Sequence, residues 1–313
     1  MSNKIFLPLF KQYRTEQILG FISIGLILVL QGISGVSFGT QVLTNFASNS
    51  SYFCLAIGML AVMATGGIDL SASSILALSA VCAAQLLKVG LPPGLAVFIS
   101  FVVAVLLGVS NGILIVTTHL QPLIITLATS FIFRGIVLVI TGGLPISQLP
   151  KNFRSFFNTS LLGLDKASWS VLIMWLVMAI ILHYTVLGHY LTGIGGNASA
   201  LKRAGVSVAA YTVVAYVVAA IFYWSAGLII ISRLNSAEPT IALNHEMYAI
   251  CAVVMGGSKL TGGNYRLTGT ILAVFLLGAI RQALVLANIS PYFQQLATGL
   301  LLLIFVVISS RDL

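Results

Sequence analysis

The feature that most constrains this chain is a series of long apolar runs separated by short polar segments. Of its 313 residues, 59% are hydrophobic and only 7% are charged, whereas a soluble domain carries about 25% charged residues. So little polar surface cannot cover a water-soluble globule, and lipid must therefore be the solvent. A membrane-spanning helix needs about 20 mostly apolar residues. The sequence predicts an all-α polytopic membrane protein that forms one transmembrane domain, residues 1–313.

The apolar runs predict about ten transmembrane helices. Lys and Arg are more frequent on the side that would hold both termini, so both termini are expected in the cytoplasm. The net charge of +9 is assigned to orientation and to anionic lipid headgroups, not to nucleic acid. The first run is too long for a signal-peptide core and is read as an uncleaved span. The predicted spans are residues 17–37, 43–65, 71–89, 94–117, 122–141, 169–187, 209–233, 244–256, 267–287 and 293–309.

Two connections between the predicted spans exceed turn length. Residues 142–168 are expected outside, where Pro145, Pro150 and an aromatic cluster could lie on the membrane surface as a short helix. Residues 188–208 are expected in the cytoplasm as a loop. A faint repeat relates 56–71 to 249–263, because both segments begin Ala-Ile and break at Gly-Gly. The repeat is predicted to be parallel, with halves at about 40–141 and 209–309.

The first polar constellation is "MATGGIDLSASS", residues 63–74. Gly66 and Gly67 allow a helix to unwind and another backbone to approach. Unwound backbone at membrane depth is tolerated only where it is packed in protein or lines a watery cavity. Asp69 or Ser71 is expected to cap the next helix, and the break could also mark the translocation path or its gate.

The second constellation is "NHEMYAICAVVMGGSKLTGGNYRLTGT", residues 244–270. Glu246 begins an inward helix, where a carboxylate suits the helix dipole. Four glycines make a predicted tight inner turn. A phosphate-binding GxxxxGK[ST] motif is absent from the whole chain, so ATP is not hydrolysed by that route here. The four turn glycines are Gly256, Gly257, Gly262 and Gly263.

The third constellation is "NASALKRAG", residues 197–205. Asn197 is a good N-cap, and Gly205 is a natural stop in the left-handed conformation. Lys202 lies in the last turn of the predicted helix. Two interpretations are open: a solvated turn at the headgroups, or a projection that docks into a groove of a partner protein.

Two arginines lie inside predicted spans, where a charge must pair, snorkel or face water. Arg281 is near a span end and is expected to snorkel, whereas Arg134 is expected to face the protein interior. The three cysteines lie far apart in apolar runs and read as small core residues, and the histidines show no metal-ligand spacing.

Together these constellations resemble the permease family of bacterial ABC importers for ribose, galactose, arabinose and related sugars. "GGIDLSASS" is similar to the family's GGIDLSVGS signature, and "QPLIITLATSFIFRGIVLVITGG" to its PFIVTLGT…RG segment. "GIGGNASALKRAGVSV" and "EMYAICAVVMGGSKLTGG" resemble its cytoplasmic loop and its EL-D-AIAAVVLGG block. The resemblance runs from about residue 40 to the C-terminus. The sequence departs from the family pattern at Ser73, Tyr248, His189 and Tyr265, which allows a divergent solute such as a furanose, a polyol or autoinducer-2.

The resemblance implies a translocation subunit in the bacterial inner membrane that pairs with a second permease chain, the same or a sister. It also implies a cytoplasmic ABC ATPase that binds ATP and Mg, and a periplasmic or lipid-anchored solute-binding protein. No cofactor and no catalytic residue are expected in this chain. The residues expected at the path or gate are Gly66, Gly67, Asp69, Ser71, Asn45, Asn49, Thr126, Arg134 and Glu246. Those expected to couple to the ATPase are Gly195, Gly196, Asn197, Ala200, Leu201, Lys202 and Gly205.

Two other functions remain to be weighed. An ion-coupled secondary transporter of a small polar solute would need a titratable site deep in the membrane, for which Asp69 and Glu246 are the acidic candidates. A membrane enzyme would need a His-carboxylate cluster or a metal set, and the sequence shows neither pattern.

Overall fold

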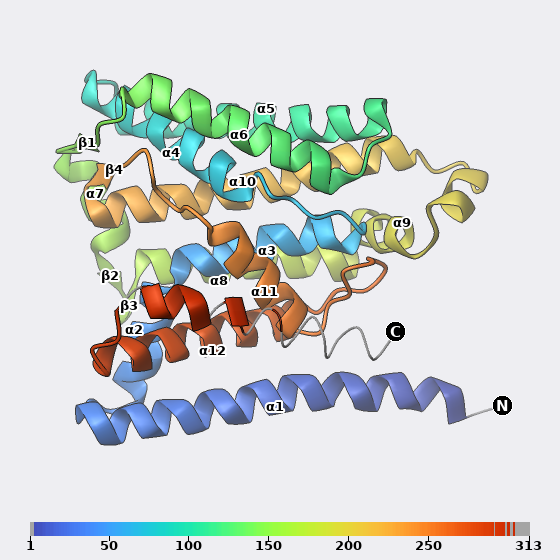
Figure 1. Cartoon of the computed structure of the whole chain (residues 1–313), viewed down its shortest axis with the longest axis horizontal. Coiled ribbons are helices and arrows are strands. Elements are labelled where there is room, and N and C mark those ends of the chain that lie inside the picture. Colours follow the sequence, from blue (N-terminus) through green and yellow to red (C-terminus); the bar gives the residue numbers. More distant parts are fainter. Residues whose placement is uncertain (1–2, 291, 298, 301–302, 304–313) are drawn as a thin grey trace.

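The computed structural model describes residues 3–290, 292–297, 299–300 and 303, and nearly all of them are helical. The long helices lie side by side along one direction (Figure 1). The helices are α1 (Asn3–Ser34), α2 (Phe38–Ser48), α3 (Ser50–Ala64), α4 (Ala72–Lys88), α5 (Pro93–Thr118), α6 (Pro122–Thr141), α7 (Lys151–Asn158), α8 (Lys166–Tyr184), α9 (Val186–Arg203), α10 (Val208–Leu234), α11 (His245–Met255) and α12 (Leu267–Leu286). Strands β1 (Ile146–Ser147) and β4 (Ser236–Ala237) pair antiparallel, as do β2 (Ser160–Leu161) and β3 (Leu164–Asp165).

Helix α3 forms the centre of the bundle. Every one of its residues except Tyr52 is buried, as expected for a helix that is apolar on all sides. It packs closely against α10, because a Cβ atom on Gly58 would lie 2.8 Å from the Cβ of Phe222. On α5, a Cβ on Gly112 would likewise lie 2.6 Å from the Cα of Val213 in α10. Small residues at such contacts are typical of helix packing in membranes.

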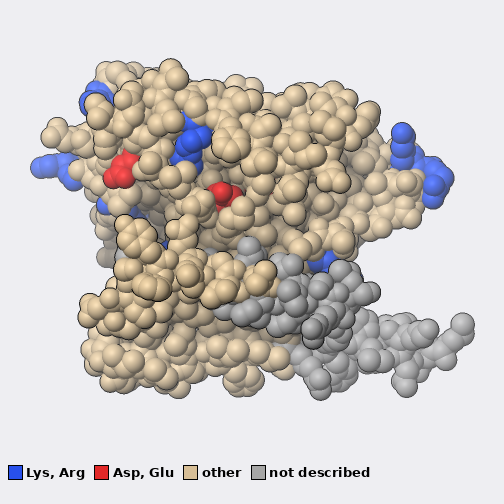
Figure 2. Space-filling view, viewed as in Figure 1, with Lys and Arg blue, Asp and Glu red and all other residues tan. Residues whose placement is uncertain are grey.

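Six helices of the described chain are long and apolar enough to cross a membrane, or seven if the bent pair α2–α3 counts as one span. Helices α4 and α11 are apolar but shorter, and most of the predicted span 293–309 lies outside the described residues. The chain is therefore an all-α polytopic membrane protein, and the count of ten spans stays a prediction. Figure 2 shows basic side chains at both ends of the molecule and mostly uncharged side chains, with a few charged ones, on the face between them.

Two predicted segments differ from the structure. The span 43–65 is not one straight helix, because α2 and α3 meet at an angle of 60°. Residues 188–208 are not a loop: α9 occupies most of this segment, and Thr185 caps it by accepting a hydrogen bond from the Gly188 N–H. The short helix expected in 142–168 is present as α7, with Phe153 and Phe157 packed against the hydrophobic core, and its position at the membrane surface stays a prediction.

The two segments of the predicted repeat run in the same direction. Helices α3 and α11 both point towards the end of the molecule that carries α9, and each is followed by a helix that runs back, α4 and α12 respectively (Figure 1). This agrees with a parallel repeat at the level of these four helices. The division into two halves, 40–141 and 209–309, stays a prediction.

Candidate functional site

The chain between α3 and α4 is unwound, as the Gly-Gly pair predicts. Asp69 is fully buried there, and its Oδ1 accepts hydrogen bonds from the Ser71 N–H at 2.9 Å and from the Ser71 hydroxyl at 2.6 Å. Asp69 therefore closes a turn onto Ser71, the residue that precedes α4, and the Ser71 side chain makes no capping bond to the backbone. The predicted side-chain cap of α4 by Asp69 or Ser71 is not formed, and the aspartate instead orders the turn that leads into the helix.

Neighbouring helices hold this break in place. The Thr126 hydroxyl oxygen on α6 accepts a hydrogen bond from the Leu70 N–H at 3.1 Å and lies 3.1 Å from the Ile68 carbonyl oxygen. On α5, the Asn111 amide donates to the Ser71 hydroxyl oxygen at 2.7 Å. Thr126 thus replaces a backbone bond that the unwound chain lacks, and Asn111 holds the Ser71 side chain in place. Such partners from neighbouring helices are a condition for irregular backbone within a membrane protein.

The second carboxylate oxygen of Asp69 is buried and accepts no well-aligned hydrogen bond within the part of the chain that the structure describes, and the buried hydroxyl of Tyr216 has no partner there either. The hydroxyl of Tyr223, which like Tyr216 lies on α10, is close enough to the Asp69 carboxylate to interact with it. The carboxylate of Asp69 is therefore enclosed by the bundle, with tyrosine hydroxyls of α10 as its polar neighbours.

Five glycines from three Gly-Gly pairs meet at the end of α3. We call Gly66, Gly195, Gly196, Gly262 and Gly263 the glycine junction. A Cβ on Gly195 would lie 2.2 Å from the Gly263 nitrogen, and one on Gly262 would lie 2.4 Å from the Gly66 nitrogen. The Gly263 N–H donates to the carbonyl oxygen of Ala64, the last residue of α3, at 3.0 Å. The α3–α4 break, helix α9 and the α11–α12 turn are thus in direct backbone contact.

Helix α9 changes direction two residues after Gly195. Asn197 has non-helical backbone angles, φ −161° and ψ 86°, and its Oδ1 accepts a hydrogen bond from the Ala200 N–H at 2.9 Å. Gly205 ends the second part of α9 with φ +82°, and the Val206 N–H donates to the Leu201 carbonyl oxygen at 3.1 Å. The predicted N-cap and left-handed stop are both confirmed.

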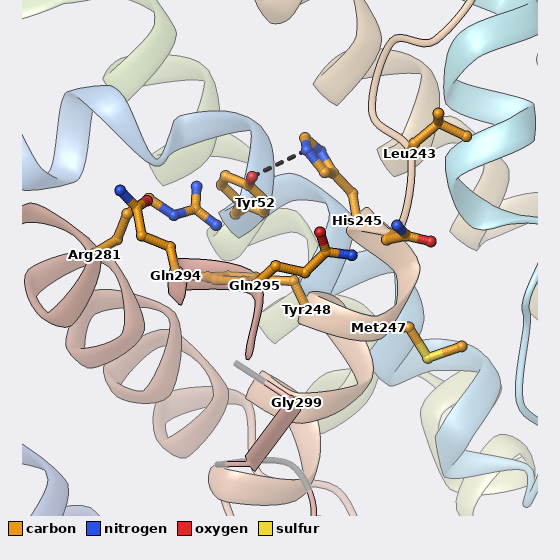
Figure 3. A pocket seen from close by; sticks show the side chains of 10 residues that line it. Tyr52, Leu243, His245, Met247, Tyr248, Arg281, Gln294, Gln295 and Gly299 are labelled. Carbon is orange, nitrogen blue, oxygen red and sulfur yellow. Dashed lines mark hydrogen bonds between the residues drawn. The ribbon is translucent and has the colours of Figure 1, made fainter. Parts of the chain in front are cut away.

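A cavity of about 540 Å³ opens at the other end of α3. Tyr52 at the start of α3 and Tyr248 on α11 have ring centroids 4.2 Å apart, and the Tyr52 hydroxyl lies 3.0 Å from Nε2 of His245. The guanidinium carbon of Arg281, on α12, lies 4.4 Å from the Tyr52 ring centroid and 5.0 Å from that of Tyr248. In Figure 3, Tyr52 lies between Arg281 and His245, with Gln294 and Gln295 beside them.

The comparison with protein families decides what kind of protein carries these features. Residues 41–306 match the family described as "Branched-chain amino acid transport system / permease component". The chain belongs to this permease family. Its members are membrane components of transport systems and not catalytic enzymes, and this favours the ABC permease over the ion-coupled secondary transporter.

Several curated relatives of the permease are named for sugars. The ribose import permease protein of Bacillus subtilis (strain 168) is 36% identical over 82% of this chain and 80% of its own. The D-allose transport system permease protein of Escherichia coli (strain K12) is 32% identical over 81% and 78%. The L-arabinose transport system permease protein of the same strain is 31% identical over 81% and 77%. No solved structure matches the chain.

The predicted site residues of the permease lie in three places. Gly66, Gly67, Asp69, Ser71 and Thr126 lie at the break beside the glycine junction. Asn45 and Asn49 lie at the α2–α3 bend, where the Asn49 amide donates to the Asn45 carbonyl oxygen at 2.8 Å. Arg134 lies beside the start of α4, because its Nη2 donates to the Ser73 carbonyl oxygen at 3.4 Å, and Glu246 lies in the first turn of α11. Their assignment to the path stays a prediction.

Arg134 makes contacts that position a backbone segment. Its Nη1 donates to the carbonyl oxygens of Pro239 at 3.1 Å and Ile241 at 2.9 Å, just before α11 begins. It therefore fixes the entry to α11, which carries His245 and Tyr248 into the cavity. Arg281 does not snorkel as expected, because it stacks on tyrosine rings within the cavity.

The sequence analysis missed the cavity residues of the permease. His245 and Tyr248 lie three positions apart, which places them on one face of a helix, and Tyr248 stands where the family pattern has aspartate. The available signals for a binding cavity were an arginine inside one predicted span, Arg281, and a tyrosine in each of two other spans, Tyr52 and Tyr248. Nothing in the sequence indicates that these spans meet.

Proposed function

We propose that this permease is the solute-conducting subunit of an ATP-driven importer for a sugar or a sugar-like solute. The relatives named for ribose, allose and arabinose support the solute class. The end of the molecule that carries α9 would face the cytoplasm, together with both termini, and α7 would face outside. A cytoplasmic ATPase, a solute-binding protein and a second permease chain complete the proposed importer.

The observation that carries this proposal is the glycine junction. It brings α9 into backbone contact with the α3–α4 break and with the α11–α12 turn. The second part of α9 projects from the bundle, with Ala200 and Lys202 exposed. In the proposed importer this projection docks on the ATPase, and the junction passes the resulting displacement to both unwound segments.

Assembly with an ATPase tests the proposal. We expect the permease, co-expressed with its cognate ATPase subunit, to retain that subunit through purification and to increase its ATP turnover when the loaded binding protein is added. Replacing Ala200 by Trp should disturb the docking surface and uncouple ATP turnover from the binding protein, while the permease remains folded. A permease that purifies alone and transports down an ion gradient would contradict the proposal.

A further inference from the structure

The cavity at the start of α3 is lined by the guanidinium group of Arg281, whose N–H donors form no hydrogen bond with the described residues. Arg281 lies within the 6 Å range of cation–π contact with both tyrosine rings. Among the described residues it forms no hydrogen bond and no ion pair, although a guanidinium carries five N–H donors. The rings hold Arg281 in position, and its donors remain available to a bound solute.

The chain offers Arg281 no carboxylate partner in the described structure. The chain has only six acidic residues, and five of them lie in the part of the chain that the structure describes. Glu16 accepts a hydrogen bond from Thr268 at the start of α12, Asp69 is buried in the α3–α4 break, and Asp165 pairs with Arg233. Glu238 and Glu246 do not line the cavity, and Asp312 lies outside the described residues. The described lining is positive without a compensating negative charge.

The remaining lining groups suit hydroxyl groups. His245, Asn244, Gln294 and Gln295 bring ring nitrogens and amides to the cavity, and amides both donate and accept hydrogen bonds. A guanidinium matches the two oxygens of a carboxylate with two parallel hydrogen bonds, which are stronger than bonds to a neutral group. A solute with a carboxylate at one end and hydroxyl groups at the other would satisfy both parts of the lining.

We propose that this cavity binds a sugar acid, with Arg281 holding the carboxylate and the amides and His245 contacting hydroxyl groups. This inference rests on the proposed transport of sugar-like solutes and narrows their class to anionic ones. A cavity of about 540 Å³ lies in the range of small-molecule sites.

The test is solute binding to the full-length permease in nanodiscs of phosphatidylcholine, measured by calorimetry with D-ribonate and D-ribose. We expect D-ribonate to bind about tenfold more tightly than D-ribose, because one charge-assisted contact is worth about that factor. Arg281→Gln should remove this preference. Arg281→Lys keeps the charge but lacks the two parallel N–H donors of the guanidinium, and should retain part of the preference. Lys151→Gln, which removes an exposed cation on α7, is the matched control and should change nothing.

Equal binding of D-ribose and D-ribonate, or a preference that survives Arg281→Gln, would overturn the sugar-acid assignment. So would loss of D-ribonate binding in nanodiscs that contain phosphatidylglycerol, since a lipid phosphate would then be the natural occupant. If Arg281→Gln does not fold, the same comparison with Arg281→Lys decides. None of these results depends on the ATPase. Failure of the sugar-acid assignment can therefore be distinguished from failure of the proposed importer function, which the assembly with the ATPase tests.

Discussion

Asp69 uses one carboxylate oxygen to hold the turn that leads into α4, and its other oxygen forms no well-aligned hydrogen bond with the described residues. Asparagine can accept the same two hydrogen bonds, so Asp69→Asn should fold with the stability of the parent protein. Asp69→Ala loses both bonds to Ser71 and should lower the free energy of unfolding by about 1 kcal/mol. The loss of charge in Asp69→Asn should still change ATP turnover of the assembled importer severalfold.

Thermal unfolding and ATP turnover, measured on both variants with the ATPase and binding protein, separate the turn contact from the charge. If Asp69→Asn matches the parent in turnover, Asp69 has a structural role only. A contact between Asp69 and Ser71 could be predicted from the sequence, because the two residues are two positions apart. The surroundings of Oδ2 could not be predicted, because they depend on which helices pack around the break.

At the scale of elements, helix α9 connects to the rest of the permease through Gly195. A Cβ there would lie within 2.3 Å of both the Gly263 nitrogen and the Ala64 carbonyl oxygen, and neither backbone atom can move independently. Gly195→Ala should therefore force the glycine junction apart and destabilise the protein by about 1–3 kcal/mol, the usual range for overpacking. It should also weaken the coupling between ATP turnover and transport.

The adjacent residue provides the matched control. A Cβ on Gly196 would meet nothing within 4 Å, so Gly196→Ala should leave both the melting temperature and the coupling ratio unchanged. If Gly195→Ala behaves like Gly196→Ala, the junction is not a tight contact in the working protein, and the route from α9 to the breaks is wrong.

The second part of α9 shows how much of this element can be predicted from sequence. The N-cap at Asn197 and the stop at Gly205 depend on residues within one turn, and both are predictable. The helical part that precedes Asn197 is not predictable, because its glycines lower helix propensity and the packing that stabilises it comes from other elements.

At the scale of the whole molecule, the cavity and the glycine junction are separated along α3. Ala64 comes twelve positions after Tyr52, which is about 18 Å at the helical rise per residue. Composition and apolar runs were enough to predict a membrane-spanning helical bundle. The meeting of α3, α11 and α12 around the cavity was not predictable, because these helices are distant in sequence and apolar runs do not specify their neighbours.

The central claim is that ATP hydrolysis by a partner drives solute through this chain. The most direct measurement is uptake of radiolabelled solute into proteoliposomes that contain the permease and its ATPase, with the loaded binding protein outside and ATP inside. We predict uptake that requires both ATP and the binding protein and that persists when ionophores collapse the proton and sodium gradients. Uptake by the permease alone that such a gradient drives, and that ionophores abolish, would contradict the claim.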